Sequence, residues 1–159
     1  MRHIDASAVL DLWEYYPIRQ FPAVWEWFAE EFTSGELGIV DLALDEVGFR
    51  DPACKAHLEA VGVAGIIITT QVAAAALSIK SALGIVNDGY GSGVDENDIL
   101  IVATAKVHGA ELITNEGRQV KPPTFLKNCK IPAVAAMSSV SVVTMRLIDY
   151  IRQSGQVFR

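Results

Sequence analysis

The sequence predicts an α/β fold: a three-layer α/β/α sandwich in which a parallel sheet of about four or five strands lies between two layers of helices. Two observations predict it. Short apolar or β-branched segments alternate along the chain with longer segments whose apolar residues recur at helical spacing. The chain has 159 residues, 51% hydrophobic and 20% charged, which is typical of one domain with its own core. We therefore predict a single domain over residues 1–159.

Composition excludes several classes of protein. No apolar stretch is as long as the roughly 20 residues that are needed to cross a bilayer. Residues 1–5 lack the charged, apolar and small-residue regions of a secretion signal. We therefore expect a cytoplasmic protein without membrane contact. Cys54 and Cys129 have no zinc-ligand spacing and are expected to be buried. With 13 Lys and Arg against 19 Asp and Glu, the net charge is −6. That charge is unusual for a protein that coats nucleic acid, but it suits a carboxylate pocket that binds a cation.

Strand and helix signals alternate through the first half of the chain. Proline and glycine mark helix boundaries there, and Asp41 is predicted to cap a helix that carries Glu46 and turns Leu42 and Phe49 toward the core. The predicted strands are 2–5, 36–40 and 66–68. The first predicted helix begins at Ala6-Ser7 and is broken at Tyr15-Tyr16-Pro17, and another begins at Asp41. The other predicted helices are 23–32, 52–62 and 70–83.

The second half contains two segments without a regular pattern. Residues 87–93 are dense in turn residues, and residues 115–130 are polar, basic and proline-containing, with one helical turn at most near Phe125. The remaining predicted elements are a helix over 95–107 that ends at Gly109, a strand at 111–113, a strand at 139–143 and a last amphipathic helix over 144–153.

Acidic residues recur where the predicted strands end or the next helices begin. Asp5 ends the first strand, and Glu46 lies about one turn into the helix that follows the second. Asp98 opens a helix, and Glu116 comes just after the strand 111–113. Because the carboxyl ends of parallel strands meet at one edge of a sheet, these carboxylates are expected to gather there. Such a cluster is stable only when protons or hard cations neutralise it, and oxygen ligands favour Mg²⁺ or Mn²⁺.

Residues 98–116 resemble a known family. An acid opens an Ala-rich helix, His108-Gly109-Ala110 and a short apolar strand follow, and Thr114-Asn115-Glu116 supplies a Thr-x-acid ending. This order resembles that of PIN-domain nucleases. Ile4-Asp5-Ala6-Ser7 is similar to the first motif of the family, and residues 39–47 are similar to its second motif, whose acid maps onto Glu46.

A narrower resemblance lies in the aromatic segments of the first third. Tyr15-Tyr16-Pro17, Phe21-Pro22 and Trp25-Glu26-Trp27 are similar to a bacterial, largely uncharacterised PIN-like branch. The resemblance thus covers most of the chain, and it implies one PIN-like domain over residues 1–159.

The resemblance implies a Mg²⁺- or Mn²⁺-dependent endoribonuclease that hydrolyses phosphodiester bonds, of the kind found as toxins in toxin–antitoxin pairs. RNA is the implied substrate, and an antitoxin protein and a second copy of the chain are the implied partners. Ser7 and Thr114 would orient the metal-binding carboxylates. The implied catalytic and metal-binding residues are Asp5, Glu46, Asp98 and Glu116.

Several candidate residues have a second interpretation. Capping of a helix explains Asp95 better than metal contact does, although Asp95 remains a supporting candidate. Arg118 and Lys121 either reach substrate phosphates or are solvated cations of a loop. Asp11 is interpreted as a solvated surface charge. The aromatic residues Trp13, Trp25, Trp27 and Phe28 are expected in the core rather than as stacking surfaces for bases.

Two other functions remain open at this stage. The fourth acid of the family is more often Asp, so Glu116 supports a catalytically degenerate PIN-like protein that binds RNA or a protein partner without cleavage. A metal-dependent phosphatase would use the same carboxylate chemistry on small esters.

Overall fold

The computed structural model describes residues 1–159 as an α/β protein built on five parallel strands. The strands lie in the order β3-β2-β1-β4-β5, with His3 of β1 opposite Gly38 of β2 and Leu112 of β4. Because β1 is central, the ends of β2 and β4 lie beside the residue that follows β1, Asp5. The strands are β1 (Arg2–Ile4), β2 (Leu37–Val40), β3 (Gly65–Ile66), β4 (Glu111–Ile113) and β5 (Thr144–Met145).

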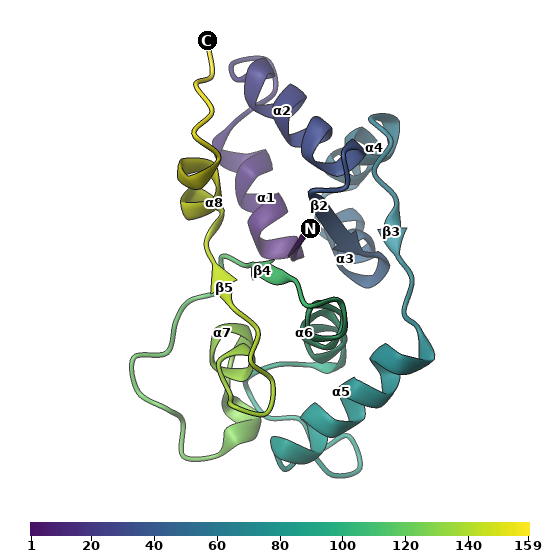
Figure 1. Ribbon diagram of the computed structural model, residues 1–159, viewed down its shortest axis with the longest axis vertical. Helices are drawn as coiled ribbons and strands as arrows, with labels where there is room; N and C mark the ends of the chain where they lie inside the picture. The colour runs from purple at the N-terminus through teal and green to yellow at the C-terminus, as the bar shows by residue number, and fades with distance from the viewer.

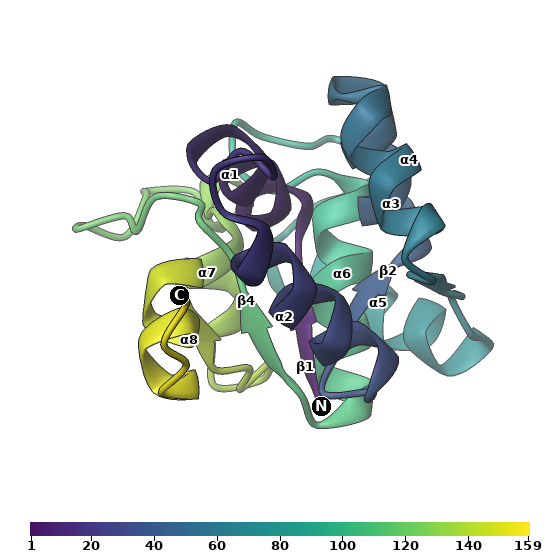
Figure 2. The same ribbon diagram turned by 90° about the horizontal axis from the view of Figure 1, so that it is seen from above.

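Helices cover both faces of this sheet, which confirms the predicted three-layer α/β/α architecture. In Figure 1, α1, α2 and α8 lie over one face and α5, α6 and α7 over the other, and Figure 2 shows α3 and α4 together beside β2. The longest helices, α5 and α6, have 13 residues, and none combines the length and apolar composition that a membrane crossing requires. The helices are α1 (Ala6–Tyr15), α2 (Pro22–Thr33), α3 (Asp41–Arg50), α4 (Pro52–Ala60), α5 (Thr70–Ala82), α6 (Glu96–His108), α7 (Ile131–Ala135) and α8 (Leu147–Ser154), with a 3-10 turn at Leu126–Asn128.

The core lies on both sides of the sheet. All four residues of β2 are buried, as expected for a parallel strand covered on both faces. Helix α6 packs closely against α5, and its central residues are almost all buried. Trp25, Trp27 and Phe28 are also buried, which confirms their predicted place in the core, and both cysteines are buried and free.

The last strand comes later in the chain than predicted. The prediction of a strand at 139–143 was wrong, because Val140 and Ser141 donate backbone hydrogen bonds back to Met137 and Ser141 has a positive φ of 56°. These residues form a turn. The strand β5 follows them, where the N–H of Thr114 donates to the carbonyl oxygen of Met145 at 2.9 Å. Helix α8 consequently begins at Leu147 rather than at residue 144, and the short helix α7 was not predicted.

Helix α3 is rotated relative to the prediction. Phe49, expected in the core, has 88% of its surface exposed, and Leu42 is only half-buried. Asp41 is the first helical residue, and Val40 occupies the N-cap position instead. The face that packs inward carries Ala43, Leu44 and Val47, whose smaller side chains suit the close packing of α3 against α1, α4 and β3.

Gly65 provides a test of the packing between β3 and α3. A Cβ atom at this position would lie 2.5 Å from the Cα of Asp41, so the backbone would have to move. We expect Gly65→Ala to lower the free energy of unfolding by about 1–3 kcal/mol in urea denaturation. Gly117→Ala is the matched control, since its Cβ would meet no atom within 4 Å. Equal stability of the two variants would contradict this packing.

Candidate functional site

The four predicted carboxylates come from four separate segments and gather at the carboxyl edge of the sheet. Asp5 follows β1, Glu46 lies in α3, Asp98 is in the first turn of α6 and Glu116 follows β4. Burial raises the pKa of Asp5, Glu46 and Asp98, and the negative charge of Glu116 raises the pKa of each one further. Glu116 is therefore close enough to influence all three of the other carboxylates.

Asp5 is the most deeply buried member of this carboxylate cluster, with 3% of its surface exposed. Its Oδ1 accepts hydrogen bonds from the hydroxyl of Ser7 at 2.7 Å and from the N–H of Ala8 at 3.1 Å, which makes Asp5 the N-cap of α1. Its Oδ2 accepts from the hydroxyl of Thr114 at 2.6 Å. Burial raises the pKa of Asp5 to about 6 although these three donors act to lower it. Both oxygens are thus held in a fixed orientation.

Asp98 and Asp95 cap the start of α6 together. Asp95 accepts the N–H of Asp98 at 2.9 Å, and Asp98 accepts the N–H of Asp95 at 3.0 Å. The predicted N-cap at Asp95 is confirmed. Burial raises the pKa of Asp98 to about 7, and the charges of Asp95, Glu116 and Glu46 contribute to that rise. Because Asp95 also raises the pKa of Glu46, it is a fifth carboxylate near the cluster.

Glu116 makes a contact that a shorter aspartate could not make without movement of the backbone. Its Oε2 accepts a hydrogen bond from the N–H of Ile131, the first residue of α7, at 2.9 Å. Its own N–H donates to the hydroxyl of Thr114 at 3.2 Å. The extra methylene of Glu116 therefore joins the cluster to the far end of the irregular segment 117–130.

The donor set fits a hard divalent cation in its chemistry. The cluster offers only carboxylate oxygens, the ligands that Mg²⁺ and Mn²⁺ prefer. None of its members forms an ion pair with a lysine or arginine, although Arg50 acts to lower the pKa of Glu46. In the observed conformation no three or more Asp, Glu, His or Cys side chains form a complete metal-binding group. Asp98 and Glu116 each engage one carboxylate oxygen with a backbone N–H, that of Asp95 and that of Ile131.

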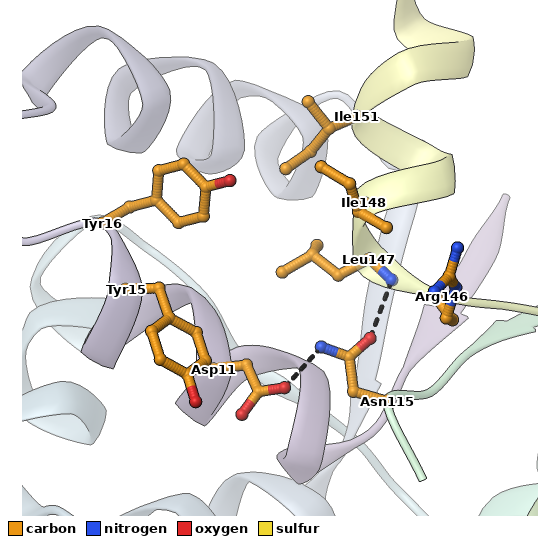
Figure 3. Close-up of a pocket in the computed structure, with 8 residues that line it drawn as sticks. All are labelled: Asp11, Tyr15, Tyr16, Asn115, Arg146, Leu147, Ile148 and Ile151. Atoms are coloured by element: carbon orange, nitrogen blue, oxygen red, sulfur yellow. Dashed lines mark hydrogen bonds between the residues drawn. The ribbon is translucent and has the colours of Figure 1, made fainter. Parts of the chain in front are cut away.

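Asn115 and Asp11 belong to the surroundings of this cluster, and sequence reasoning missed both. The N–H of Asn115 donates to Ser7 at 3.0 Å, and its side-chain amide donates to Asp11 at 2.6 Å (Figure 3). Asp11 is half-buried, so its interpretation as a solvated surface charge was wrong. The spacing of Ser7 and Asp11 could have indicated this role of Asp11. The two residues are four positions apart and therefore lie on the same face of α1.

The two predicted phosphate-binding cations differ in position. Arg118 lines a cavity of about 460 Å³ together with Asn115, Glu116 and Arg146, and every residue around this cavity is polar or glycine. Lys121 is exposed and is not among the residues that line it. The structure therefore brings Arg118, but not Lys121, beside a carboxylate of the cluster.

Comparison with known proteins places the chain in a family. Residues 3–158 match the model of a family described as "Domain of unknown function (DUF4411)", and the chain belongs to that family. No curated protein matches the sequence. A solved structure titled "Crystal structure of PAE2754 from Pyrobaculum aerophilum" is similar with a TM-score of 0.55 and 15% identity, over 98% of this chain and 97% of that chain. At this identity the similarity shows a shared fold.

The raised pKa values predict how stability depends on pH without a divalent cation. The pKa of Asp98 rises from 3.8 to about 7 and that of Asp5 from 3.8 to about 6, so between these limits the two carboxyls bind more protons in the folded protein than in the unfolded chain. Burial lowers the pKa of His3 from 6.5 to about 4, which acts in the opposite direction. The contribution of Asp98 and Asp5 to the free energy of unfolding should therefore fall as pH rises from about 4 to 7, while that of His3 rises between about pH 4 and 6.5. Urea denaturation at pH 5 and pH 8 with a chelator measures the net change.

Asp98→Asn should remove the part of the fall in the free energy of unfolding that comes from Asp98. Asp149→Asn is the control: a hydrogen bond from Arg146 lowers the pKa of Asp149, so its contribution is lost only on the acid side of its ordinary pKa. A change in the free energy of unfolding between pH 5 and pH 8 that is the same in Asp98→Asn as in the unsubstituted protein would contradict the raised pKa of Asp98.

Proposed function

We propose that this protein is a metal-dependent endoribonuclease that hydrolyses phosphodiester bonds at the carboxylate cluster. The observation that carries the proposal is the convergence of Asp5, Glu46, Asp98 and Glu116, whose charges oppose one another and form no ion pair with a lysine or arginine. A divalent cation would supply that balance and attract a phosphate. The resemblance of residues 98–116 to PIN domains supports the same function.

In this proposal Asp5, Glu46, Asp98 and Glu116 would hold Mg²⁺ or Mn²⁺. The bound ion would supply polarisation of the phosphate and of a water molecule. Ser7 and Thr114 fix the carboxylate of Asp5, and the reciprocal cap with Asp95 fixes the start of the helix that carries Asp98. These hydrogen bonds would orient the site before substrate arrives.

Substrate contacts of the proposed enzyme follow from the polar cavity. Arg118 lies on its wall with Glu116 and makes no ion pair, so its guanidinium is free to bind a phosphate oxygen. The PIN-domain resemblance supports products with a 5′-phosphate and a 3′-hydroxyl. It also supports a cytoplasmic location, an antitoxin partner and a homodimer, and these belong to the proposal on that ground alone.

A second candidate function rests on the hydrogen bonds of the cluster itself. Glu116 is engaged with Ile131, and Asp98 is engaged with Asp95. If these contacts persist when substrate is bound, the protein would bind RNA or a protein partner without cleaving RNA. The carboxylates would then stabilise the loop and helix that surround the cavity.

Cleavage assays separate the two functions. We expect purified protein to cut labelled single-stranded RNA only when Mn²⁺ or Mg²⁺ is present. Without a bound cation, the negatively charged carboxylates would repel the phosphodiester. Asp5→Asn and Asp98→Asn should abolish cleavage, and Thr114→Val should slow it by about 10- to 100-fold through loss of its hydrogen bond to Asp5. Asp88→Asn, which alters an exposed ion pair with Lys80, is the control that should cut normally.

The second candidate function would replace the first if Mn²⁺ binds and several RNAs remain intact. Cleavage that survives both Asp5→Asn and Asp98→Asn would show that another site or a contaminant is responsible.

Two substitutions at Glu116 separate its charge from its length. Glu116→Asp should break the bond to the N–H of Ile131, and hydrogen exchange of that amide should quicken about fivefold, since such a bond contributes about 1 kcal/mol. Glu116→Gln keeps an acceptor oxygen and should preserve the slow exchange while losing cleavage. Equal exchange at Ile131 in both variants would contradict the role assigned to the longer side chain.

A further inference from the structure

An apolar cavity of about 390 Å³ lies between α1 and α8, and the chemistry proposed above does not use it (Figure 3). Its size falls within the range of about 300–1,000 Å³ that is typical of small-molecule sites, at the lower end. Five of the eight residues around it are hydrophobic. The cavity is therefore large enough for a ligand of moderate size and favours one with apolar faces.

The two walls of the cavity suit a flat ligand. Figure 3 shows Tyr15 and Tyr16 across from Leu147, Ile148 and Ile151. An aromatic ring placed between these walls would meet tyrosine on one side and aliphatic carbon on the other. Aromatic side chains bind unpaired bases in this way, because every base has an apolar face.

One end of the cavity is polar and has an unused acceptor. Both groups of the Asn115 side-chain amide are engaged: the NH₂ group donates to Oδ2 of Asp11 at 2.6 Å, and the oxygen accepts the N–H of Leu147 at 2.9 Å. Asn115 thus fixes the Asp11 carboxylate, whose Oδ1 has no hydrogen-bond partner. An ionised carboxylate only accepts hydrogen bonds, so it selects a ligand that presents N–H groups. Guanine presents two adjacent N–H donors on its pairing edge.

The apolar cavity lies beside the polar cavity of the proposed cleavage site. It shares Asn115 and Arg146 with the polar cavity that contains Glu116 and Arg118. Arg146 is balanced by Asp149 at 3.0 Å, which leaves Arg118 as the cation without an ion pair. A polar compartment beside an apolar one matches the two parts of a nucleotide, the sugar-phosphate and the base.

We propose that the apolar cavity binds one unpaired base of the RNA substrate, next to the phosphodiester that is cut, and that it prefers guanine. This inference rests on the nuclease function proposed above. Tyr15 and Tyr16 contact the face of the base, and Asp11, held by Asn115, accepts hydrogen bonds from its N–H groups. An apolar side chain of a protein partner would leave the free oxygen of Asp11 without a donor, which favours the base.

Mononucleotides test base binding without cleavage, because they contain no phosphodiester bond. We expect 5′-GMP to bind about tenfold more tightly than 5′-UMP in NMR titrations with Mg²⁺, with shifts at the amides of Asn115 and Leu147. Asp11→Asn should remove most of this preference, and Asp88→Asn, a matched change in an exposed ion pair, should keep it. Tyr15→Leu alters a largely exposed side chain, so it should keep the fold while weakening both nucleotides.

The outcomes distinguish this proposal from the nuclease function. Equal binding of the two nucleotides, or a guanine preference that both Asp11→Asn and Tyr15→Leu leave unchanged, would overturn the base site even if RNA is cut. A guanine preference that depends on Asp11 would support the base site even if no RNA is cut. With active protein, cuts concentrated next to guanines and scattered in Asp11→Asn would place the base beside the cleaved bond.

Discussion

The buried carboxylate of Asp5 is the group on which the site depends. It ends the central strand, caps α1 and accepts hydrogen bonds from Ser7 and Thr114, so it joins β1, α1 and the end of β4 at one point. A buried carboxylate is stable only when its oxygens have donors, and here three donors surround it. The hydroxyls of Ser7 and Thr114 also accept hydrogen bonds, from the N–H of Asn115 and the N–H of Glu116 respectively. Through Asn115 and Glu116 this network reaches residues that line both neighbouring cavities.

Electrostatics and packing act against each other at this edge of the sheet. The parallel topology brings the ends of β1, β2 and β4 together, and each segment carries an acid. Burial makes their negative charge costly, as the raised pKa of Asp98 shows. The fold nevertheless keeps these acids and pairs none of them with a lysine or arginine, an arrangement that costs stability unless a cation joins it. This cost is the physical reason for assigning function to the cluster rather than structural support alone.

Much of the fold could be predicted from sequence because its signals are local. The capping acids Asp95 and Asp98, the closing Gly109 and the apolar strand that follows it are each defined by nearby residues. The last strand was misplaced because β-branched composition at 139–143 outweighed the turn at Ser141, whereas the true register is set by pairing with the distant strand β4. Phe49 was misplaced because adjacent positions on α3 differ in orientation by about 100° and sequence alone did not fix the rotation.

The candidate site was only partly visible in the sequence. Four acids after strands indicated a cluster, but the roles of Asp11 and Asn115 depend on a contact across more than a hundred residues. The contact of Glu116 with α7 could not be foreseen either, because α7 itself was not predicted. The two residues that were missed, Asp11 and Asn115, act through a contact between distant segments.

Calorimetry of Mn²⁺ binding to the purified protein at pH 7 is the experiment that shows whether the carboxylate cluster holds a divalent cation. We expect saturable binding that is lost in Asp98→Asn and kept in Asp88→Asn, with protons released because the pKa of Asp98 is raised to about 7. Absence of binding, or binding that Asp98→Asn leaves unchanged, would contradict the assignment of these carboxylates to a cation.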